Sequence, residues 1–177
     1  FMNKINDVEV IVSEKDNQRI EIQLAEYLTE YKQSLAFAES CTGGYLSHLI
    51  TLLPGSSDYF KGGIVAYSNQ IKKNILQVSE EVLLKEGAVS EATVEQMAKQ
   101  TLLLFQSDYA VAVSGIAGPG GGTPEKPIGT VWVSIAQKEK ITSQLFQFGN
   151  IDRNLIIRKT AIYTLYILNQ IIEKQYH

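Results

Sequence analysis

The sequence predicts an α/β fold, a three-layer α/β/α sandwich with a mixed sheet that is mostly parallel and ends in a C-terminal antiparallel hairpin. Three observations predict this class of fold. Short apolar runs alternate with segments of helical periodicity, as in sheets of buried parallel strands. Two strand-like segments then follow each other with only Lys138-Glu139-Lys140 between them. A long amphipathic segment ends the chain.

The helices are predicted where apolar residues recur at spacings of three and four. The first covers residues 18–31, and the second covers residues 43–53 and ends at Pro54-Gly55. A third begins at Ser68-Asn69. Serine N-caps precede helices over residues 80–85 and 91–105, and a long helix covers residues 155–174.

The strands are predicted over residues 34–38, 64–67, 109–113, 130–136 and 141–148. With 177 residues the chain has the length of one domain, which we assign to residues 17–177. Residues 1–16 form a polar N-terminal extension. Its short apolar run, residues 8–12, is compatible with an edge strand or with a tail, and the pattern leaves both open.

Composition excludes several classes of function. A net charge of −3, with Lys and Arg scattered along the chain, indicates no nucleic-acid partner. Neither a signal peptide nor an apolar run of about 18 residues is visible, so we expect no membrane partner and a cytoplasmic location. The single cysteine and the two histidines form no metal-binding cluster, so no metal site and no cofactor are predicted.

The loops that carry chemistry are expected at one edge of the sheet. In an open α/β sheet, ligands bind beyond the carboxyl ends of the parallel strands. The turns at residues 40–44, 67–72 and 114–127 follow such strands. The second strand of the hairpin returns residues 149–153 to the same edge. Four loops that are distant in sequence are therefore expected to surround one pocket.

Ser40 is the first candidate nucleophile. It follows an apolar run and enters a turn closed by Gly43 and Gly44, where a hydroxyl and free backbone N–H groups are presented together. A serine in this position also commonly caps the next helix. Lys72 falls in the first turn of the helix that follows Ser68, where the helix dipole disfavours an ammonium ion. Ser40 and Lys72 therefore form a candidate Ser/Lys dyad, whereas the alternative leaves Lys72 on the surface.

Other candidates also have two interpretations. Cys41 and His48 are a possible nucleophile–base pair, but a cysteine next to Ser40 is expected to point into the core. The glycine run that starts at Gly118 fits no nucleotide-binding pattern, and it forms either an anion-binding nest or a flexible lid. Arg153 follows Asp152, which is expected to cap the last helix, and is either a phosphate clamp or part of a structural ion pair.

Five sequence blocks, taken in this order and spacing, closely resemble the CinA C-terminal domain family over residues 18–172. They are Ala38-Glu39-Ser40-Cys41-Thr42-Gly43-Gly44, Pro54-Gly55-Ser56-Ser57, Gly63-Ile64-Val65-Ala66-Tyr67-Ser68-Asn69, Gly87-Ala88-Val89-Ser90 and Ser114-Gly115-Ile116-Ala117-Gly118-Pro119-Gly120-Gly121. The chain departs from the family in a loop richer in glycine, Gly120-Gly121-Gly122-Thr123. Longer members carry a further N-terminal domain, so the chain is either a stand-alone form or part of such a protein.

The resemblance implies an amidohydrolase that converts nicotinamide mononucleotide, a nucleotide substrate, into nicotinic acid mononucleotide and ammonia. It implies Ser40 as the nucleophile and Lys72 as the base, with Tyr67 and Ser57 beside them. The substrate-binding residues that it implies are Glu39, Thr42, Gly43, Gly44, Ser57, Ser114, Gly115, Gly118 and Arg153. Hydrolysis of another small amide or nucleotide, or a non-catalytic role in competence or damage responses, stays open. A homo-oligomer, with a dimer favoured, is expected.

Overall fold

The structure is a computed structural model that describes residues 19–176. The expected extension over residues 1–16 and the first residue of the expected first helix lie outside this range. The elements in chain order are α1 (Ile20–Glu30), β1 (Leu35–Glu39), α2 (Tyr45–Thr51), η2 (Ser56–Asp58), β2 (Phe60–Val65), α3 (Asn69–Asn74), α4 (Glu80–Lys85), α5 (Glu91–Phe105), β3 (Tyr109–Gly115), β4 (Thr130–Ala136), β5 (Ile141–Gln147) and α6 (Arg153–Tyr176).

The five strands form one mixed sheet in the order β2-β1-β3-β4-β5. Strand β1 lies between β2 and β3 and is parallel to both. Strand β4 lies between β3 and β5 and is antiparallel to both, so the sheet ends in the expected hairpin. Central strands β1 and β3 read as continuous apolar runs because helices cover both of their faces.

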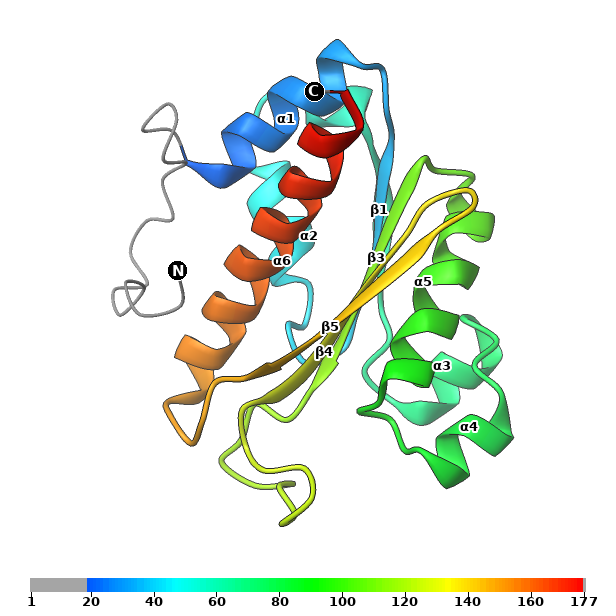
Figure 1. The fold of residues 1–177 in the computed structure, drawn as a ribbon, viewed down its shortest axis with the longest axis vertical. Coiled ribbons are helices and arrows are strands. Elements are labelled where there is room, and N and C mark those ends of the chain that lie inside the picture. The colour runs from blue at the N-terminus through cyan, green and yellow to red at the C-terminus, as the bar shows by residue number, and fades with distance from the viewer. Residues whose placement is uncertain (1–18, 177) are drawn as a thin grey trace.

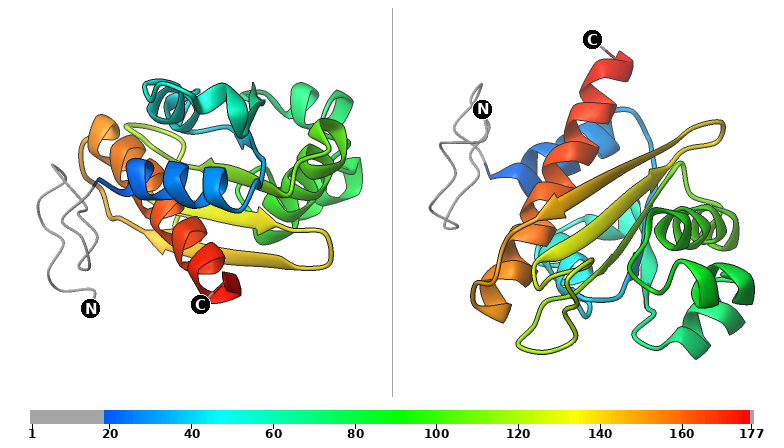
Figure 2. Two further views of the ribbon diagram at one scale, coloured as in Figure 1. Left: turned by 90° about the horizontal axis from the view of Figure 1, so that it is seen from above. Right: turned by 60° about the horizontal axis from the view of Figure 1, so that its bottom comes forward.

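Helices α1, α2 and α6 cover one face of the sheet, and α3, α4 and α5 lie on the other side (Figures 1 and 2). Each face has its own core. Phe37, Val111 and Val113 pack with α1, α2 and α6, whereas Ala38 and Ala112 belong to the core beside α5. Because successive strand residues point to opposite faces, large and small residues alternate along the strands. The alanines allow α5 to lie close to the sheet.

The apolar stripe of α6 belongs to the core. Ile156, Leu165, Leu168 and Ile172 are fully buried, and the helix packs against α1 and α2. These four residues of the long amphipathic helix therefore face the interior of the domain.

Two element boundaries differ from the sequence-based expectation because of glycines. Strand β2 starts at Phe60, four residues before the expected start, since Gly62 and Gly63 lie within the strand. A Cβ atom on Gly63 would lie 2.7 Å from Ser47 Oγ, so the missing side chain allows α2 to approach β2. Helix α2 starts at Tyr45, two residues late, because Gly43 and Gly44 have φ angles of 61° and 100°.

Candidate functional site

Ser40 lies at the carboxyl end of β1, where the strand turns towards α2. Its N–H donates to the carbonyl of Val113 over 3.0 Å, which extends the β1–β3 pairing by one residue. Its own carbonyl accepts a hydrogen bond from the N–H of Gly43 over 3.1 Å, so the chain reverses directly after it. Only 8% of Ser40 is exposed. The turn therefore presents one hydroxyl in a nearly buried position.

Lys72 reaches this hydroxyl from α3. The side chain of Ser68 caps α3 by accepting a hydrogen bond from the N–H of Ile71, as expected for this serine. The ammonium nitrogen Nζ of Lys72 lies 2.9 Å from Ser40 Oγ and 2.8 Å from the carbonyl oxygen of Ala66. Lys72 is 1% exposed. The sequence-based pairing of Ser40 with Lys72 is thus present as a direct, buried hydrogen bond.

Burial lowers the pKa of Lys72 below the usual 10.5, because an ammonium ion loses solvation in the interior. No carboxylate of the described residues hydrogen-bonds to its Nζ to offset this loss. Burial is the leading cause of this lowered pKa. The expected position of Lys72 in the first turn of the helix is wrong, because the short helix α3 ends at Asn74 and has Lys72 in its last turn. The next residue, Lys73, is half-exposed and pairs with Glu80 over 2.7 Å. The alternative that left Lys72 on the surface is therefore wrong, and it is Lys73 that lies at the surface.

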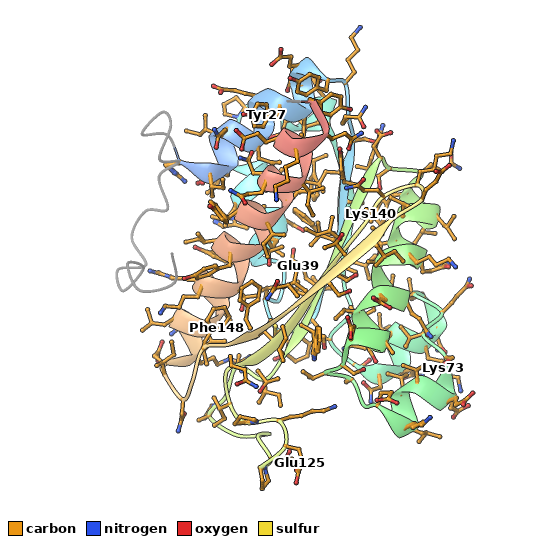
Figure 3. The ribbon with its side chains drawn as sticks, viewed as in Figure 1. Tyr27, Glu39, Lys73, Glu125, Lys140 and Phe148 are labelled. Carbon is orange, nitrogen blue, oxygen red and sulfur yellow. The ribbon has the colours of Figure 1, made fainter. Side chains whose placement is uncertain are left out.

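Glu39 directly precedes Ser40 and is 1% exposed. Its Oε2 accepts hydrogen bonds from the N–H groups of Gly44 and Leu46, over 3.1 and 3.0 Å. Its Oε1 accepts from the N–H and the hydroxyl of Ser47, over 2.8 and 2.7 Å. Figure 3 shows Glu39 in the middle of the molecule and Lys73 at its margin. The carboxylate is therefore bonded to the start of α2, a role that the sequence analysis missed.

The turn leaves two amide groups unpaired beside Ser40. The N–H of Gly43 donates to Ser40 and that of Gly44 donates to Glu39. Within residues 19–176, the N–H groups of Cys41 and Thr42 donate to no other residue. The hydroxyl of Thr42 is buried and has no hydrogen-bond partner among the described residues. Among residues 41–44, the N–H groups of Cys41 and Thr42 are thus the two without an acceptor in another described residue.

Tyr67, Arg153 and Gly118 form a second cluster of expected site residues. The guanidinium of Arg153 donates to the carbonyl of Gly118 over 2.6 Å and to the hydroxyl of Tyr67 over 2.9 Å. Arg153 begins α6, and the side chain of Asp152 accepts from the N–H groups of Asn154 and Leu155, as expected for a helix cap. Three loops that are far apart in sequence therefore meet at one guanidinium. The hydroxyl of Tyr67 contacts Arg153, not Ser40 or Lys72.

Ser114 and Gly115 are the last residues of β3, and Cys41 follows Ser40 in the neighbouring turn after β1. Ser114 is buried and donates its hydroxyl hydrogen bond to the carbonyl of Ala88 over 2.7 Å. A Cβ atom on Gly115 would lie 3.1 Å from the sulfur of Cys41. Cys41 packs in the core beside α1, α2 and α6, and burial raises the pKa of its thiol to about 12. The thiol is therefore protonated at neutral pH and no competing nucleophile.

Ser57 lies away from Ser40, near the opposite end of β1. Ser57 is in η2, before β2, whose first residue pairs with the first residue of β1. The five residues of β1 separate the two ends by about 16 Å at roughly 3.3 Å per residue. The expectation that Ser57 lies beside the dyad is not met within this chain, because α2 carries the backbone to the opposite edge. His48 is exposed on α2.

The glycine-rich loop leaves the same edge of the sheet (Figure 1). Residues 119–125 are exposed, and a cavity of about 420 Å³ lies among residues 119–124, Pro127, Ile128 and Asn150. The ammonium of Lys126 donates to the carbonyl of Glu86 over 2.5 Å, which ties the loop to the end of α4. Within the described residues no group of three or more His, Cys, Asp or Glu is placed to hold a metal ion.

The fold and the site together define an open α/β protein with a buried serine–lysine pair at the carboxyl edge of its sheet. The model of the CinA C-terminal domain matches residues 17–172. The chain belongs to this family. It is 47% identical over 150 residues to a CinA-like protein of Thermotoga maritima, which covers 85% of this chain and 36% of the relative. The chain thus spans about a third of the length of such curated relatives.

Solved structures share the fold. A CinA superfamily protein from Klebsiella pneumoniae has a TM-score of 0.84 at 32% identity, covering 88% of this chain and 96% of that chain. The competence/damage inducible protein CihA from Agrobacterium tumefaciens has a TM-score of 0.80 at 37% identity, covering 84% and 93%. Among residues 19–176, no helix has the length and apolar character that a membrane crossing requires.

Proposed function

We propose that the chain is an amidohydrolase that hydrolyses the carboxamide of nicotinamide mononucleotide through Ser40 and Lys72. The observation that carries the proposal is the 2.9 Å hydrogen bond between Lys72 Nζ and Ser40 Oγ, made inside the protein. A lysine that burial pushes towards its neutral form is suited to remove a proton from a serine. The choice of substrate rests on the resemblance to nicotinamide-nucleotide amidases within the family.

In the first half of the reaction, Ser40 Oγ attacks the amide carbon as neutral Lys72 takes its proton. Lys72 keeps one N–H directed at the carbonyl of Ala66, which holds the lone pair of Nζ towards Ser40. The N–H groups of Cys41 and Thr42 stabilise the negative oxygen of the tetrahedral intermediate. The C–N bond then breaks, Lys72 returns the proton to the leaving nitrogen, and ammonia and an acyl-Ser40 result.

In the second half, water attacks the acyl carbon. Lys72 accepts a proton from this water, and the bond between the carbonyl carbon and Ser40 Oγ breaks. The proton passes back to Ser40, and nicotinic acid mononucleotide leaves. No step requires a metal ion or an organic cofactor.

The substrate phosphate is proposed to bind Arg153 beside the glycine-rich loop. A guanidinium has five N–H donors, and the described contacts to Gly118 and Tyr67 use two of its nitrogen atoms. Donors remain for a phosphate without loss of either contact. The family membership supports a further proposal, that the protein acts as a cytoplasmic homo-oligomer.

The test is ammonia release from nicotinamide mononucleotide by the purified protein, with a chelator present. We expect wild-type activity and a loss of at least about 10³-fold in Ser40→Ala and in Lys72→Ala, because nucleophile and base act as a unit. Lys73→Ala is the matched control, since this lysine pairs with Glu80 at the surface. Near-normal turnover by Ser40→Ala would contradict the assignment of Ser40 as the nucleophile. Absence of ammonia from folded wild type would favour another substrate or a non-catalytic role.

A further inference from the structure

A carboxylate buried next to the nucleophile needs an explanation. Glu39 is 1% exposed, and no Lys or Arg side chain of the described residues pairs with it. An unpaired buried charge is costly unless hydrogen bonds replace its lost hydration. Four donors supply this replacement, and all belong to residues 44–47. Each carboxylate oxygen thus accepts two hydrogen bonds from the turn. A ligand could bind either oxygen only by replacing one of these hydrogen bonds.

The bonds of Glu39 decide which amides stay free. Glu39 accepts the N–H of Gly44 and those of Leu46 and Ser47, so the donors of the first turn of α2 are occupied. The two amides between Ser40 and Gly43 donate to no other described residue. The free donors are therefore the two residues that directly follow the nucleophile in the chain.

The same bonds fix the shape of the turn. Glu39 is the last residue of β1 and is held from both sides, since it pairs with Val65 of β2 and Val113 of β3. Its side chain reaches forward to Gly44, five residues later, and closes a loop around Ser40. A loop with a rigid strand at one end and a helix start at the other has few ways to rearrange.

We infer that Glu39 is a positioning residue: its carboxylate closes the turn so that Ser40 Oγ and the free N–H groups of Cys41 and Thr42 face the same reacting carbonyl group, Oγ its carbon and the N–H groups its oxygen. The inference rests on the proposed function for the identity of the reaction. It replaces the expectation that Glu39 lines the substrate pocket. Glu39 acts through the backbone and does not touch the substrate.

The variant that tests this is Glu39→Gln, which keeps the size of the side chain but turns one acceptor oxygen into a donor. The matched control is Asp108→Asn. The Asp108 carboxylate also accepts one backbone N–H and one hydroxyl, both from Ser34, each over 2.7 Å, and it lies at the opposite edge of the sheet. Glu39→Asp keeps the charge with a shorter reach, and serves in place of Glu39→Gln if that variant does not fold.

Two readouts separate the inference from the proposed function. The first is kcat and KM for ammonia release. The second is the rate at which diisopropyl fluorophosphate modifies Ser40, followed by intact mass, in which the O–P bond forms, fluoride leaves and Lys72 takes the proton. The reagent needs the same oxyanion donors but no amide substrate. We expect Glu39→Gln to lower kcat and the rate of modification by about 10²-fold, the effect of losing one oxyanion donor, with KM little changed.

Asp108→Asn is expected to lower the thermal midpoint and to keep both rates. Equal losses of rate in the two variants at equal loss of stability would overturn the inference, since Glu39 would then only stabilise the fold. Wild-type rates in Glu39→Gln would overturn it as well. If wild-type Ser40 is modified but releases no ammonia, and the modification depends on Glu39, the positioning role stands and the proposed substrate falls. A wild-type Ser40 that resists the reagent overturns the positioning role.

Discussion

Lys72 shows how one buried residue changes the meaning of a sequence pattern. It stands next to Lys73 in a polar helix, yet only Lys73 is at the surface. The difference arises from the direction of the side chains, since neighbours on a helix point about 100° apart. Lys72 turns towards Ser40 and the carbonyl of Ala66, and Lys73 turns towards Glu80.

The lowered pKa of Lys72 predicts a pH-dependent stability. Between the folded pKa and the usual 10.5, the unfolded chain binds a proton that the folded protein does not, so the free energy of unfolding rises with pH across this window. Each pKa unit of lowering corresponds to about 1.4 kcal/mol. Lys72→Met is expected to remove this increase in the free energy of unfolding with pH and to be more stable than wild type at neutral pH. Urea unfolding of both proteins from pH 6 to pH 11 measures the free energy of unfolding at each pH.

The control for this prediction is Lys73→Met, which removes a surface lysine from the same helix. It is expected to keep the wild-type slope, because Lys73 is half-exposed. Equal pH slopes in wild type and Lys72→Met would show that Lys72 is protonated in the folded protein.

Arg153 carries a second prediction at this scale. Arg153→Ala is expected to raise KM for nicotinamide mononucleotide about tenfold or more, the effect of losing a charge-assisted hydrogen bond, and to change KM for its dephosphorylated riboside much less. Steady-state kinetics with both substrates measure this difference. Arg158→Ala, an exposed arginine one turn further along α6, is the control. Equal losses for the two substrates would assign Arg153 to holding Tyr67 and Gly118 alone.

At the scale of elements, local signals predicted the helices well where caps mark them. Helices α4 and α5 have the expected bounds, and Ser79 and Ser90 accept the N–H bonds expected of N-caps. Strand β4 also has its expected bounds. Strand β2, Phe60–Val65, was predicted over residues 64–67, which misses its first four residues because glycines such as Gly62 and Gly63 are unfavourable in strands. Their use is visible only in three dimensions, where neighbouring side chains fill the space of the missing Cβ atoms.

The end of β3 yields a prediction for an element junction. A Cβ atom on Gly115 would lie 2.6 Å from Val131 Cγ2 and 3.0 Å from the carbonyl of Thr130, so β3 and β4 would have to separate. Gly115→Ala is therefore expected to lower the free energy of unfolding by about 1–3 kcal/mol. In the control, Gly120→Ala, the new methyl group meets no atom within 4 Å, and we expect a change within about 0.5 kcal/mol. Similar values for both glycines would contradict this account of the β3–β4 contact.

At the scale of the whole molecule, two unequal layers cover the sheet. The side with α1, α2 and α6 holds the larger core, in which Phe37 and Leu165 are fully buried. The side with α5 is built on alanines such as Ala38 and Ala112. The sheet places all three turns that follow parallel strands at one edge, and Arg153 of α6 joins two of the surrounding loops there.

The long helix yields the prediction for this scale. Leu165 lies in the stripe of α6 that faces the core and is fully buried, so Leu165→Ala is expected to lower the free energy of unfolding by about 2–5 kcal/mol. Leu84→Ala is the control, because Leu84 is 81% exposed, and its effect is expected to stay within about 0.5 kcal/mol. Chemical denaturation of both variants measures the two changes in the free energy of unfolding. A neutral Leu165→Ala would show that α6 packs elsewhere than on the sheet.

The sequence by itself determined the fold class, the order of the elements and the edge at which the chemistry collects. These follow from local periodicity and from the rule that parallel strands present their carboxyl ends together. It also singled out Ser40, Lys72 and Arg153, and the family resemblance added Tyr67. The structure gathers these four residues at that edge as two hydrogen-bonded pairs.

Only the tertiary structure decided the burial of Lys72, the bonding of Glu39 to the start of α2 and the distance of Ser57 from Ser40. The physical reason is common to all three. Solvation and hydrogen-bond partners depend on which segments pack together, and a one-dimensional pattern places a residue on an element without stating what surrounds its side chain.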